Sequence, residues 1–389
     1  MIKNKLTFIA STLSLILIYV SSSIPISYYS SYLSITGITK ATLSYSVASF
    51  FIGTMVAVLV FGRLSDYRGR KKIAIFALII AIFGSLLFYL INGEIIFLLA
   101  RLIQGFACGL AISNISSYVV DSAPNKQLAS IITSAGSMLG LAIGTLSSGI
   151  FAEFNMKMMN HIYIIIILIL TVSIILILFS KETVIAKKFT ADAIKPKISI
   201  PENVKYLFIP ASPIFISTWA LCGFYQGFSS TIAFNIFNIE STILTAIFFA
   251  SITLTQAIGS RFITSLGNAK SQKIGMLGFS ISLILIIFSL KYQMLIPFIL
   301  LTLLCGSFIG LSFTASVDSI LSKVGQNDYG NAFSSIYFIS YAGIGVINII
   351  VGQFANYYSL IEIAMGYLVL TFVSTAIVLI TLRRFKNEQ

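Results

Sequence analysis

The sequence predicts an all-α polytopic membrane protein with twelve transmembrane helices in two six-helix pseudo-symmetric bundles. Of its 389 residues, 57% are hydrophobic and only 10% are charged, whereas an average soluble protein carries about 25% charged residues. So few charges cannot cover a globular surface of this size, which excludes an ordinary soluble enzyme and a disordered chain. Two further observations, the length of the apolar runs and the placement of the basic residues, lead to the same prediction.

Twelve apolar stretches approach the length of about 20 residues that a helix needs to cross a bilayer. They are 6–28, 39–62, 73–92, 95–119, 127–151, 161–180, 206–228, 240–260, 273–290, 294–316, 329–352 and 358–381. None shows the alternating pattern of a barrel strand, so we expect a helical bundle. The first stretch follows Lys3 and Lys5 and has an alternative reading as a signal peptide, although no A-x-A cleavage motif follows it.

The basic residues orient these spans. Of the 25 Lys and Arg residues, 21 fall on the side that holds both termini. Lys40, Lys157 and Lys291 fall on the other side, and Arg101 falls inside a span. Because positive residues near spans stay cytoplasmic, we expect a multi-pass protein of the cytoplasmic (inner) membrane with both termini in the cytoplasm. The net charge of +13 is then an orientation signal and does not indicate a nucleic-acid partner.

The longest polar interval between spans divides them into six and six. We therefore predict an N-terminal six-helix bundle over 1–180, a cytoplasmic linker over 181–205 and a C-terminal six-helix bundle over 206–389. The first and seventh spans begin near residues 6 and 206. This offset, which other pairs of spans repeat, indicates two homologous halves.

The loop between the second and third spans carries the most specific pattern. Residues 62–72 read Gly-Arg-Leu-Ser-Asp-Tyr-Arg-Gly-Arg-Lys-Lys. This loop resembles the signature loop of the major facilitator superfamily, whose pattern is matched by Gly62, Asp66, Gly69, Arg70 and Lys71. The resemblance implies the major facilitator fold, a monomeric secondary transporter without a cofactor, and a latch between the two halves that involves this loop and the eleventh span.

The local chemistry of the loop is consistent with that role. Gly62 would let a neighbouring helix approach closely, and Gly69 would permit a tight turn. Asp66 stands among basic residues and could dock on the positive N-terminus of another helix. Asp121, at the end of the fourth span, is expected to join the charge network, and the alternative is a lone solvated acid at a helix end.

The corresponding loop of the second half, 260–273, keeps a glycine, Gly267, but has Thr264 at the position of Asp66. We therefore expect a one-sided latch.

Arg101 is the only charge well inside a predicted span. Together with Gln104 it resembles the R-x-x-[QG]-G motif of the fourth span in the same superfamily. A guanidinium in a membrane is costly and should face water, a carboxylate or a substrate. We predict a role in proton coupling or contact with an anion, and the alternative is snorkelling toward Glu94 at the outer interface.

Three glycines in the fifth span recur every four residues, namely Gly136, Gly140 and Gly144. Such a ridge permits close helix packing, and we expect its partner in the eighth span, at small residues such as Ala246 and Ala250. The pattern resembles the antiporter-specific motif of this span, but a threonine stands at the position of its proline.

The resemblance places a substrate cavity at mid-membrane. Its candidate polar and aromatic residues are Ser21, Trp219, Cys222, Gln226, Gln256, Tyr337, Tyr341 and Asn348. With Arg101 as its one charge, such a cavity suits neutral, anionic or mildly amphipathic molecules. The first 70 residues resemble the bicyclomycin-resistance branch of the twelve-span drug:proton antiporters, which carries an acid where this chain has Ser21, so the carrier of a coupled proton is not identified.

We therefore predict a secondary active transporter that exports a small organic molecule by alternating access, driven by an ion gradient. Its partners would be that molecule, the lipid bilayer, and a proton or another ion. Uptake of a metabolite and a non-transporting membrane sensor are the alternatives. An enzyme is not expected, because His161 is the one histidine and neither H-E-x-x-H nor G-x-S-x-G occurs. We expect no catalytic residue and no metal site.

Overall fold

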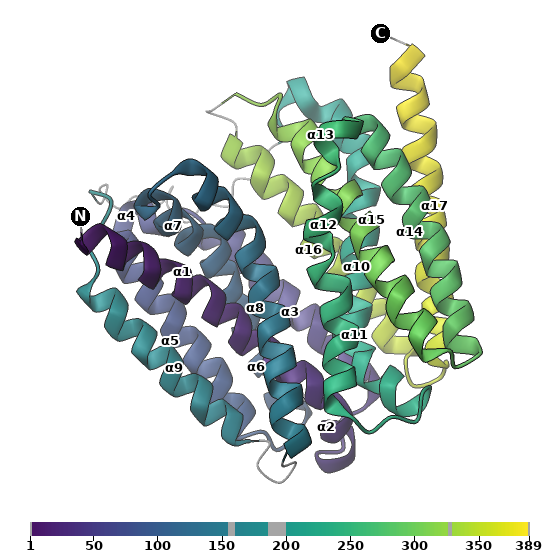
Figure 1. Cartoon of the computed structure of the whole chain (residues 1–389), viewed down its shortest axis with the longest axis horizontal. Helices are drawn as coiled ribbons and strands as arrows, with labels where there is room; N and C mark the ends of the chain where they lie inside the picture. The colour runs from purple at the N-terminus through teal and green to yellow at the C-terminus, as the bar shows by residue number, and fades with distance from the viewer. Residues whose placement is uncertain (1, 155–159, 186–199, 326–328, 388–389) are drawn as a thin grey trace. The chain divides into compact units, whose positions relative to one another are not determined.

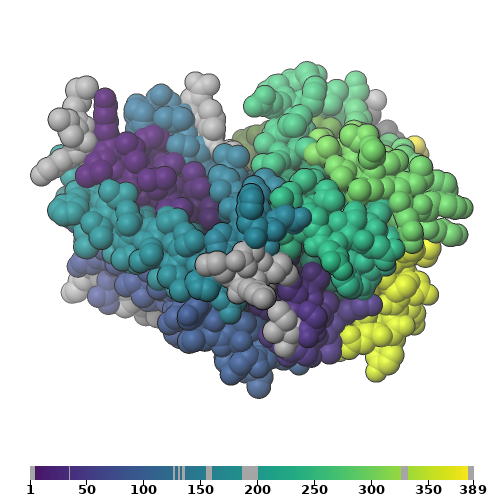
Figure 2. Space-filling model, turned by 60° about the horizontal axis from the view of Figure 1, so that its bottom comes forward, coloured from purple at the N-terminus to yellow at the C-terminus, as the bar shows by residue number. Residues whose placement is uncertain are grey.

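The computed structural model describes residues 2–154, 160–185, 200–325 and 329–387, which fold into helices joined by short connections (Figure 1). The chain divides into two compact units. Unit 1 comprises Met1–Pro196 and Ser241–Ala246, and unit 2 comprises Lys197–Glu240 and Ile247–Gln389. Within each unit, side chains fill the spaces between the ribbons (Figure 2). The centre of the predicted linker, 186–199, and the loop residue Lys157 lie outside the described residues.

Unit 1 holds the first six spans. Its helices are α1 (Ile2–Ser23), the 3-10 turn η1 (Ile24–Tyr28), α2 (Tyr29–Ile35), α3 (Lys40–Phe61), α4 (Leu64–Arg68), α5 (Arg70–Tyr89), α6 (Glu94–Leu110), the π-helical turn η2 (Ala111–Ile115), α7 (Ser116–Ser122), α8 (Lys126–Phe154) and α9 (His161–Phe179). The first span runs on through η1 into α2, because Pro25 lacks a backbone N–H and the chain tightens there without leaving the helical direction.

Unit 2 holds the remaining helices, apart from the first five residues of α11, which belong to unit 1. They are η5 (Glu202–Val204), α10 (Lys205–Asn235), α11 (Thr242–Leu254), α12 (Gln256–Ser260), α13 (Ile263–Leu266), α14 (Asn268–Lys291), α15 (Leu295–Leu321), α16 (Tyr329–Phe354) and α17 (Leu360–Asn387).

Twelve helical segments among the described residues are long and apolar enough to cross a membrane, and each coincides with one of the predicted spans. The segment His161–Phe179 has the highest mean hydropathy of the twelve, yet only 33% of its apolar window is buried. Water would disfavour so much exposed apolar surface. The predicted all-helical, multi-pass membrane protein is therefore confirmed.

Glycines let α3 and α6 pack at very short range in unit 1. A Cβ on Gly105 would fall on the backbone carbonyl of Phe50, and one on Gly109 would fall on that of Thr54. Each glycine therefore gives its partner helix the room for direct backbone contact.

The same arrangement recurs in unit 2, some 200 residues later. A Cβ on Gly306 of α15 would collide with the Ile252 carbonyl, and one on Gly310 with the Gln256 carbonyl. Glycines and partners keep their mutual spacing between the two units. This repeated contact is direct structural evidence of two pseudo-symmetric halves.

The glycine ridge of α8 packs against α1. The prediction that the eighth span covers this ridge was therefore wrong. A Cβ on Gly140 would meet the Ile16 carbonyl, and one on Gly144 the Val20 carbonyl. Gly136 also faces α1. A four-residue period identifies one face of a helix, but it does not say which neighbour covers that face.

The start of α11 is contacted by a different glycine, Gly149. A Cβ there would meet the carbonyl of Thr242 and the Cβ of Ala246, and the Thr242 hydroxyl donates to the Gly149 carbonyl at 2.7 Å. Five residues after Gly144, Gly149 points about 140° away from the ridge. Of the alanines predicted in this contact, Ala246 takes part.

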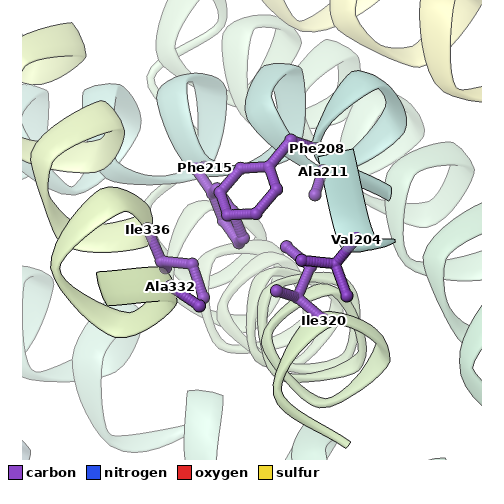
Figure 3. Packing of buried hydrophobic residues seen from close by; sticks show 7 residues of the cluster. All are labelled: Val204, Phe208, Ala211, Phe215, Ile320, Ala332 and Ile336. Carbon is purple, nitrogen blue, oxygen red and sulfur yellow. The ribbon is translucent and has the colours of Figure 1, made fainter. Parts of the chain in front are cut away.

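A buried apolar cluster joins the ends of three helices in unit 2 (Figure 3). Its members are Val204, Phe208, Ala211, Phe215, Ile320, Ala332 and Ile336. They come from η5 and α10, from α15 and from α16. Burying each large side chain of this kind contributes about 1.5–3 kcal/mol, so the cluster holds these helix ends at fixed positions beside the cavity described below.

Candidate functional site

The turn between α3 and α5 is held from within by Asn114, on the π-helical turn η2. Its side-chain oxygen accepts from the Ser65 backbone N–H at 3.0 Å, and its amide donates to the Phe61 carbonyl at 3.0 Å. Asn114 is 1% exposed. Sequence analysis missed it, although an asparagine within an apolar stretch is costly unless it is hydrogen-bonded.

Glycines stand at both ends of this turn, and only one of them has a backbone conformation that favours glycine. Gly69 has φ +94°, a conformation that L side chains rarely adopt, so the predicted tight turn is present. A Cβ on Gly62 would meet the Val58 carbonyl in its own chain, while the nearest atom of another helix, the Ser113 Cβ, would be 3.7 Å away. Gly62 is therefore not required for close approach of a neighbouring helix, contrary to the prediction.

Arg70 lies between the two predicted acids. Its Nη1 is 2.7 Å from Asp66 Oδ1, and its Nε is 2.9 Å from Asp121 Oδ2. The Arg70 side chain is only 12% exposed, against 34% for Asp66 and 30% for Asp121. One half-buried guanidinium therefore compensates two carboxylates that would repel each other without it.

A third carboxylate, which sequence analysis missed, caps the N-terminus of α5. Glu182 accepts from the backbone N–H of Arg70 at 2.9 Å and from that of Lys71 at 3.1 Å. These N–H groups have no partner within the helix, and an anion here is favoured by the helix dipole. A Cβ on Gly69 would collide with the Glu182 carboxylate, so a larger residue here would require the Glu182 side chain to shift.

Lys71 makes the complementary contact with the C-terminal end of α9. Its ammonium donates to the Leu178 carbonyl at 2.5 Å and to the Ser180 carbonyl at 3.3 Å. A cation at a helix C-terminus is the favourable counterpart of the Glu182 cap. The loop thus ties α5 to α9 at one end of unit 1.

The equivalent turn in unit 2 has the same backbone but a different chemistry. Gly267 has φ +74° and precedes α14 as Gly69 precedes α5. Thr264 donates to the Arg261 carbonyl. Arg261, Lys270 and Lys273 form no ion pair with any described residue.

Arg101 is completely buried within unit 1. Its Nη1 donates to the Ser22 carbonyl at 2.7 Å and to Gln104 Oε1 at 2.9 Å, and its guanidinium lies 4.6 Å from the centre of the Phe50 ring. The Gln104 amide donates to the Ser21 carbonyl at 3.0 Å. The predicted pair of Arg101 and Gln104 therefore acts together on the end of α1.

The Arg101 guanidinium has two further donor atoms. Its Nε and Nη2 have no hydrogen-bond partner in the described part of the chain. Glu94 accepts from the Thr42 hydroxyl at 3.0 Å, and Arg101 does not reach toward it. Arg101 thus presents charge and two donors in a buried position, which suits a polar or anionic partner.

In unit 2 the predicted cavity residues form an aromatic group and a polar pair. The Trp219 ring lies 5.2 Å from Tyr341, which lies 5.4 Å from Tyr337. The Gln256 amide is 3.3 Å from the Cys222 sulfur. Trp219, Cys222, Gln256 and Tyr337 are all half-buried.

The three other candidates, Ser21, Asn348 and Gln226, are buried. Ser21 donates to the Ile18 carbonyl at 2.7 Å. Asn348 donates to the Ile344 carbonyl at 2.9 Å and lies against Gly223 of α10. Gln226 is 5% exposed.

Twelve spans, a buried cation in one of them and a charged turn at one end define a multi-pass membrane transport protein. The family model described as Major Facilitator Superfamily matches residues 11–347, and the chain belongs to this superfamily. Its members are transporters and not enzymes.

Two curated relatives are similar over part of the chain. "Multidrug resistance protein 2" of Bacillus subtilis is 29% identical over 130 residues, which are 33% of this chain and 32% of that protein. "Quinolone resistance protein NorA" of Staphylococcus aureus is 29% identical over 133 residues, 33% of each chain. The chain thus spans about a third of the length of the curated relatives it matches.

A solved structure shows the same fold over the whole chain. It is the crystal structure of a POT family transporter in complex with 5-aminolevulinic acid, with a TM-score of 0.76 at 14% sequence identity. The match covers 98% of this chain and 96% of the other.

Proposed function

We propose that this transporter exports a small organic molecule across the cytoplasmic membrane by alternating access, driven by an ion gradient, with both termini in the cytoplasm. The names of its two partial relatives refer to drug resistance, which supports export. The prevalence of basic residues on the side of the termini supports the orientation. Uptake of a metabolite would use the same fold in the opposite direction.

The buried Arg101 carries the proposal for the substrate. It is fully buried, its Nε and Nη2 have no partner among the described side chains, and no carboxylate pairs with it. A cationic substrate would be repelled by this charge, whereas a neutral molecule with an acceptor, or an organic anion, would be attracted. In unit 2, the aromatic group of the half-buried Trp219 and Tyr337 and the buried Tyr341 would offer apolar surface to a transported molecule.

The turn between α3 and α5 supplies the proposed latch. Arg70 compensates Asp66 and Asp121 while Glu182 and Lys71 fix both ends of the turn. This network would hold the loop in one shape, so that Asp66 can dock on the eleventh span in one of the two access states. The contacts within unit 1 support this role, and the docking itself remains a proposal.

Vesicles of opposite orientation test the direction. Everted membrane vesicles energised by a respiratory substrate would take up an exported molecule, and a panel of neutral, anionic and cationic fluorescent compounds would serve as probes. We expect uptake of neutral or anionic probes and loss of uptake with an ionophore. Uptake only into right-side-out vesicles would indicate an importer, and binding without flux in either orientation would indicate a sensor.

Metabolite profiling of a deletion strain would identify the natural substrate. Accumulation of a compound inside the cell supports export. Depletion of the same compound inside the cell contradicts it.

A further inference from the structure

Unit 2 contains a cavity of about 320 Å³ at the ends of four helices. Tyr206 and Leu207 contribute from α10, Lys273 from α14, Lys323 from just beyond α15, and Leu382 from α17. The cavity is separate from Arg101, which lies in unit 1, and it plays no part in the proposed transport function. Its volume is large enough for a phosphate-bearing headgroup of a few non-hydrogen atoms beyond the phosphate.

The charged side chains that line the cavity are all basic, with no carboxylate among the described residues of its lining. Lys323 Nζ lies 3.1 Å from the Tyr206 hydroxyl and 5.7 Å from the centre of its ring. Lys273 is half-buried, and its ammonium makes no hydrogen bond or ion pair with the residues that the structure describes. A half-buried ammonium without a counter-charge favours an anionic occupant.

Uncharged polar side chains also line the cavity. Gln272 lies 3.3 Å from the Ser319 hydroxyl, and both residues line the cavity together with Asn268, on the first turn of α14. Asp318, the acid nearest along the chain, accepts from the Asn268 amide at 2.7 Å and does not line the cavity. The two charged side chains that line the cavity, Lys273 and Lys323, are therefore both cationic.

The apolar surroundings of the cavity favour a lipid over a dissolved ion as its occupant. Leu207, Pro210 and Leu382 form an apolar part of its wall. On the same helices, Ile209 and Ile380 are each 55% exposed, as expected of faces that contact acyl chains. All four helix ends lie on the side of the membrane that the basic residues assign to the cytoplasm.

We propose that this cavity binds the phosphate of an anionic phospholipid of the cytoplasmic leaflet, with Lys273 and Lys323 as its ligands and the acyl chains along the exposed apolar faces. A free phosphate ester would offer the same phosphate group to these lysines. We favour a lipid because the cavity lies at the ends of the membrane spans. The site would anchor unit 2 and make its stability depend on the lipid composition.

Binding is measured on the purified full-length chain, without any transport assay, so that its result is independent of the proposed function. Native mass spectrometry and thermal unfolding would be recorded with phosphatidylglycerol, with phosphatidylcholine, and with inorganic phosphate and glycerol phosphate at millimolar concentration. We expect phosphatidylglycerol alone to bind and to raise the unfolding temperature.

The variants are Lys273→Gln combined with Lys323→Gln, and Lys291→Gln as the control at the opposite end of α14. The double variant should bind phosphatidylglycerol about 30-fold more weakly, since each lysine near an anionic lipid contributes a factor of roughly five. The control should bind as the wild type does. The single variants, each with an intermediate loss, keep the test valid should the double variant fold poorly.

Equal affinity of the double variant and the wild type for phosphatidylglycerol would overturn the proposal. Equal protection by inorganic phosphate and phosphatidylglycerol would overturn the lipid as the source. Equal binding of phosphatidylcholine would contradict the role of the lysines as ligands of an anionic headgroup.

Discussion

The helices α6 and α15 occupy equivalent places in the two units and show what the duplication has retained. Gly105 and Gly306 press against equivalent partner backbones. Four residues before each glycine the two helices differ, with Arg101 in α6 and Thr302 in α15. The Thr302 hydroxyl lies 2.7 Å from the Tyr225 hydroxyl and donates to the Phe298 carbonyl at 2.8 Å, whereas Arg101 keeps two donors without a partner in the described chain.

The two halves therefore share their close helix packing but not their charged residues. The turns before α5 and α14 show the same difference. Gly69 and Gly267 have similar backbone angles, but Thr264 stands at the position of Asp66. Paired substitutions at equivalent positions can therefore separate architecture from transport chemistry.

The largest effect is expected where the halves are alike. Gly105→Ala and Gly306→Ala would each drive a Cβ into a backbone carbonyl, which cannot move aside as a flexible side chain can. We expect each to lose about 3 kcal/mol or more of folding free energy. Yield and thermal unfolding of purified protein would measure this.

Gly345→Ala is the matched control, since a Cβ there meets nothing within 4 Å. An alanine in an open helical position should be neutral or slightly stabilising. Equal losses at Gly345 and Gly105 would refute the close-packing explanation.

The next largest effect is expected at the latch, where the halves differ. Asp66→Asn removes the charge that Arg70 holds at 2.7 Å and should reduce flux more than 10-fold while the protein still inserts. Thr264→Asn, at the equivalent position of unit 2, should transport nearly as the wild type does. Vesicle flux normalised to the amount of inserted protein measures both, and full activity of the Asp66 variant would exclude the latch.

A smaller and opposite pair of effects is expected on stability. Arg101→Met replaces a buried, unpaired cation by an apolar chain of similar length, so the unfolding temperature should stay equal or rise. Thr302→Val leaves the Tyr225 hydroxyl without its partner and should cost about 1–2 kcal/mol. A strong destabilisation by Arg101→Met would mean that Arg101 is a structural residue.

The smallest effect is expected at the helix cap. Glu182→Gln keeps the shape of the side chain but removes the charge facing the N-terminus of α5, which should cost about 0.5–1 kcal/mol. Glu202 is an exposed residue whose carboxylate lies 3.4 Å from the Lys205 ammonium. Glu202→Gln should therefore lower the stability by less than Glu182→Gln does. The unfolding temperatures of the two variants, measured over a range of salt concentrations, would distinguish their effects. The same salt dependence for both variants would contradict the role of Glu182 as a helix cap.

The architecture could be predicted because its physical requirements are local. A span needs an uninterrupted apolar run, and a positive φ before a helix favours glycine, so the spans and Gly69 follow from the sequence. Arg101 could be singled out because a charge inside such a run is rare.

What could not be predicted depends on residues that are far apart in the chain. Glu182 caps a helix that begins more than a hundred residues earlier, and nothing in its immediate neighbours indicates this. The ridge of Gly136, Gly140 and Gly144 shows a packing face but not that α1 covers it. Lys273 and Lys323 meet at one cavity only because α14 and α15 pack side by side.

The proposed transport function depends on Arg101, and the initial rate of substrate flux in proteoliposomes that contain the Arg101→Met or the Thr302→Val variant tests it most directly. We predict at least a 10-fold loss of the rate with Arg101→Met, which corresponds to about 1.4 kcal/mol or more of activation free energy. With Thr302→Val we predict a rate within about twofold of the wild type. Equal rates for the two variants would contradict the claim that unit 1 carries the charge that transport requires.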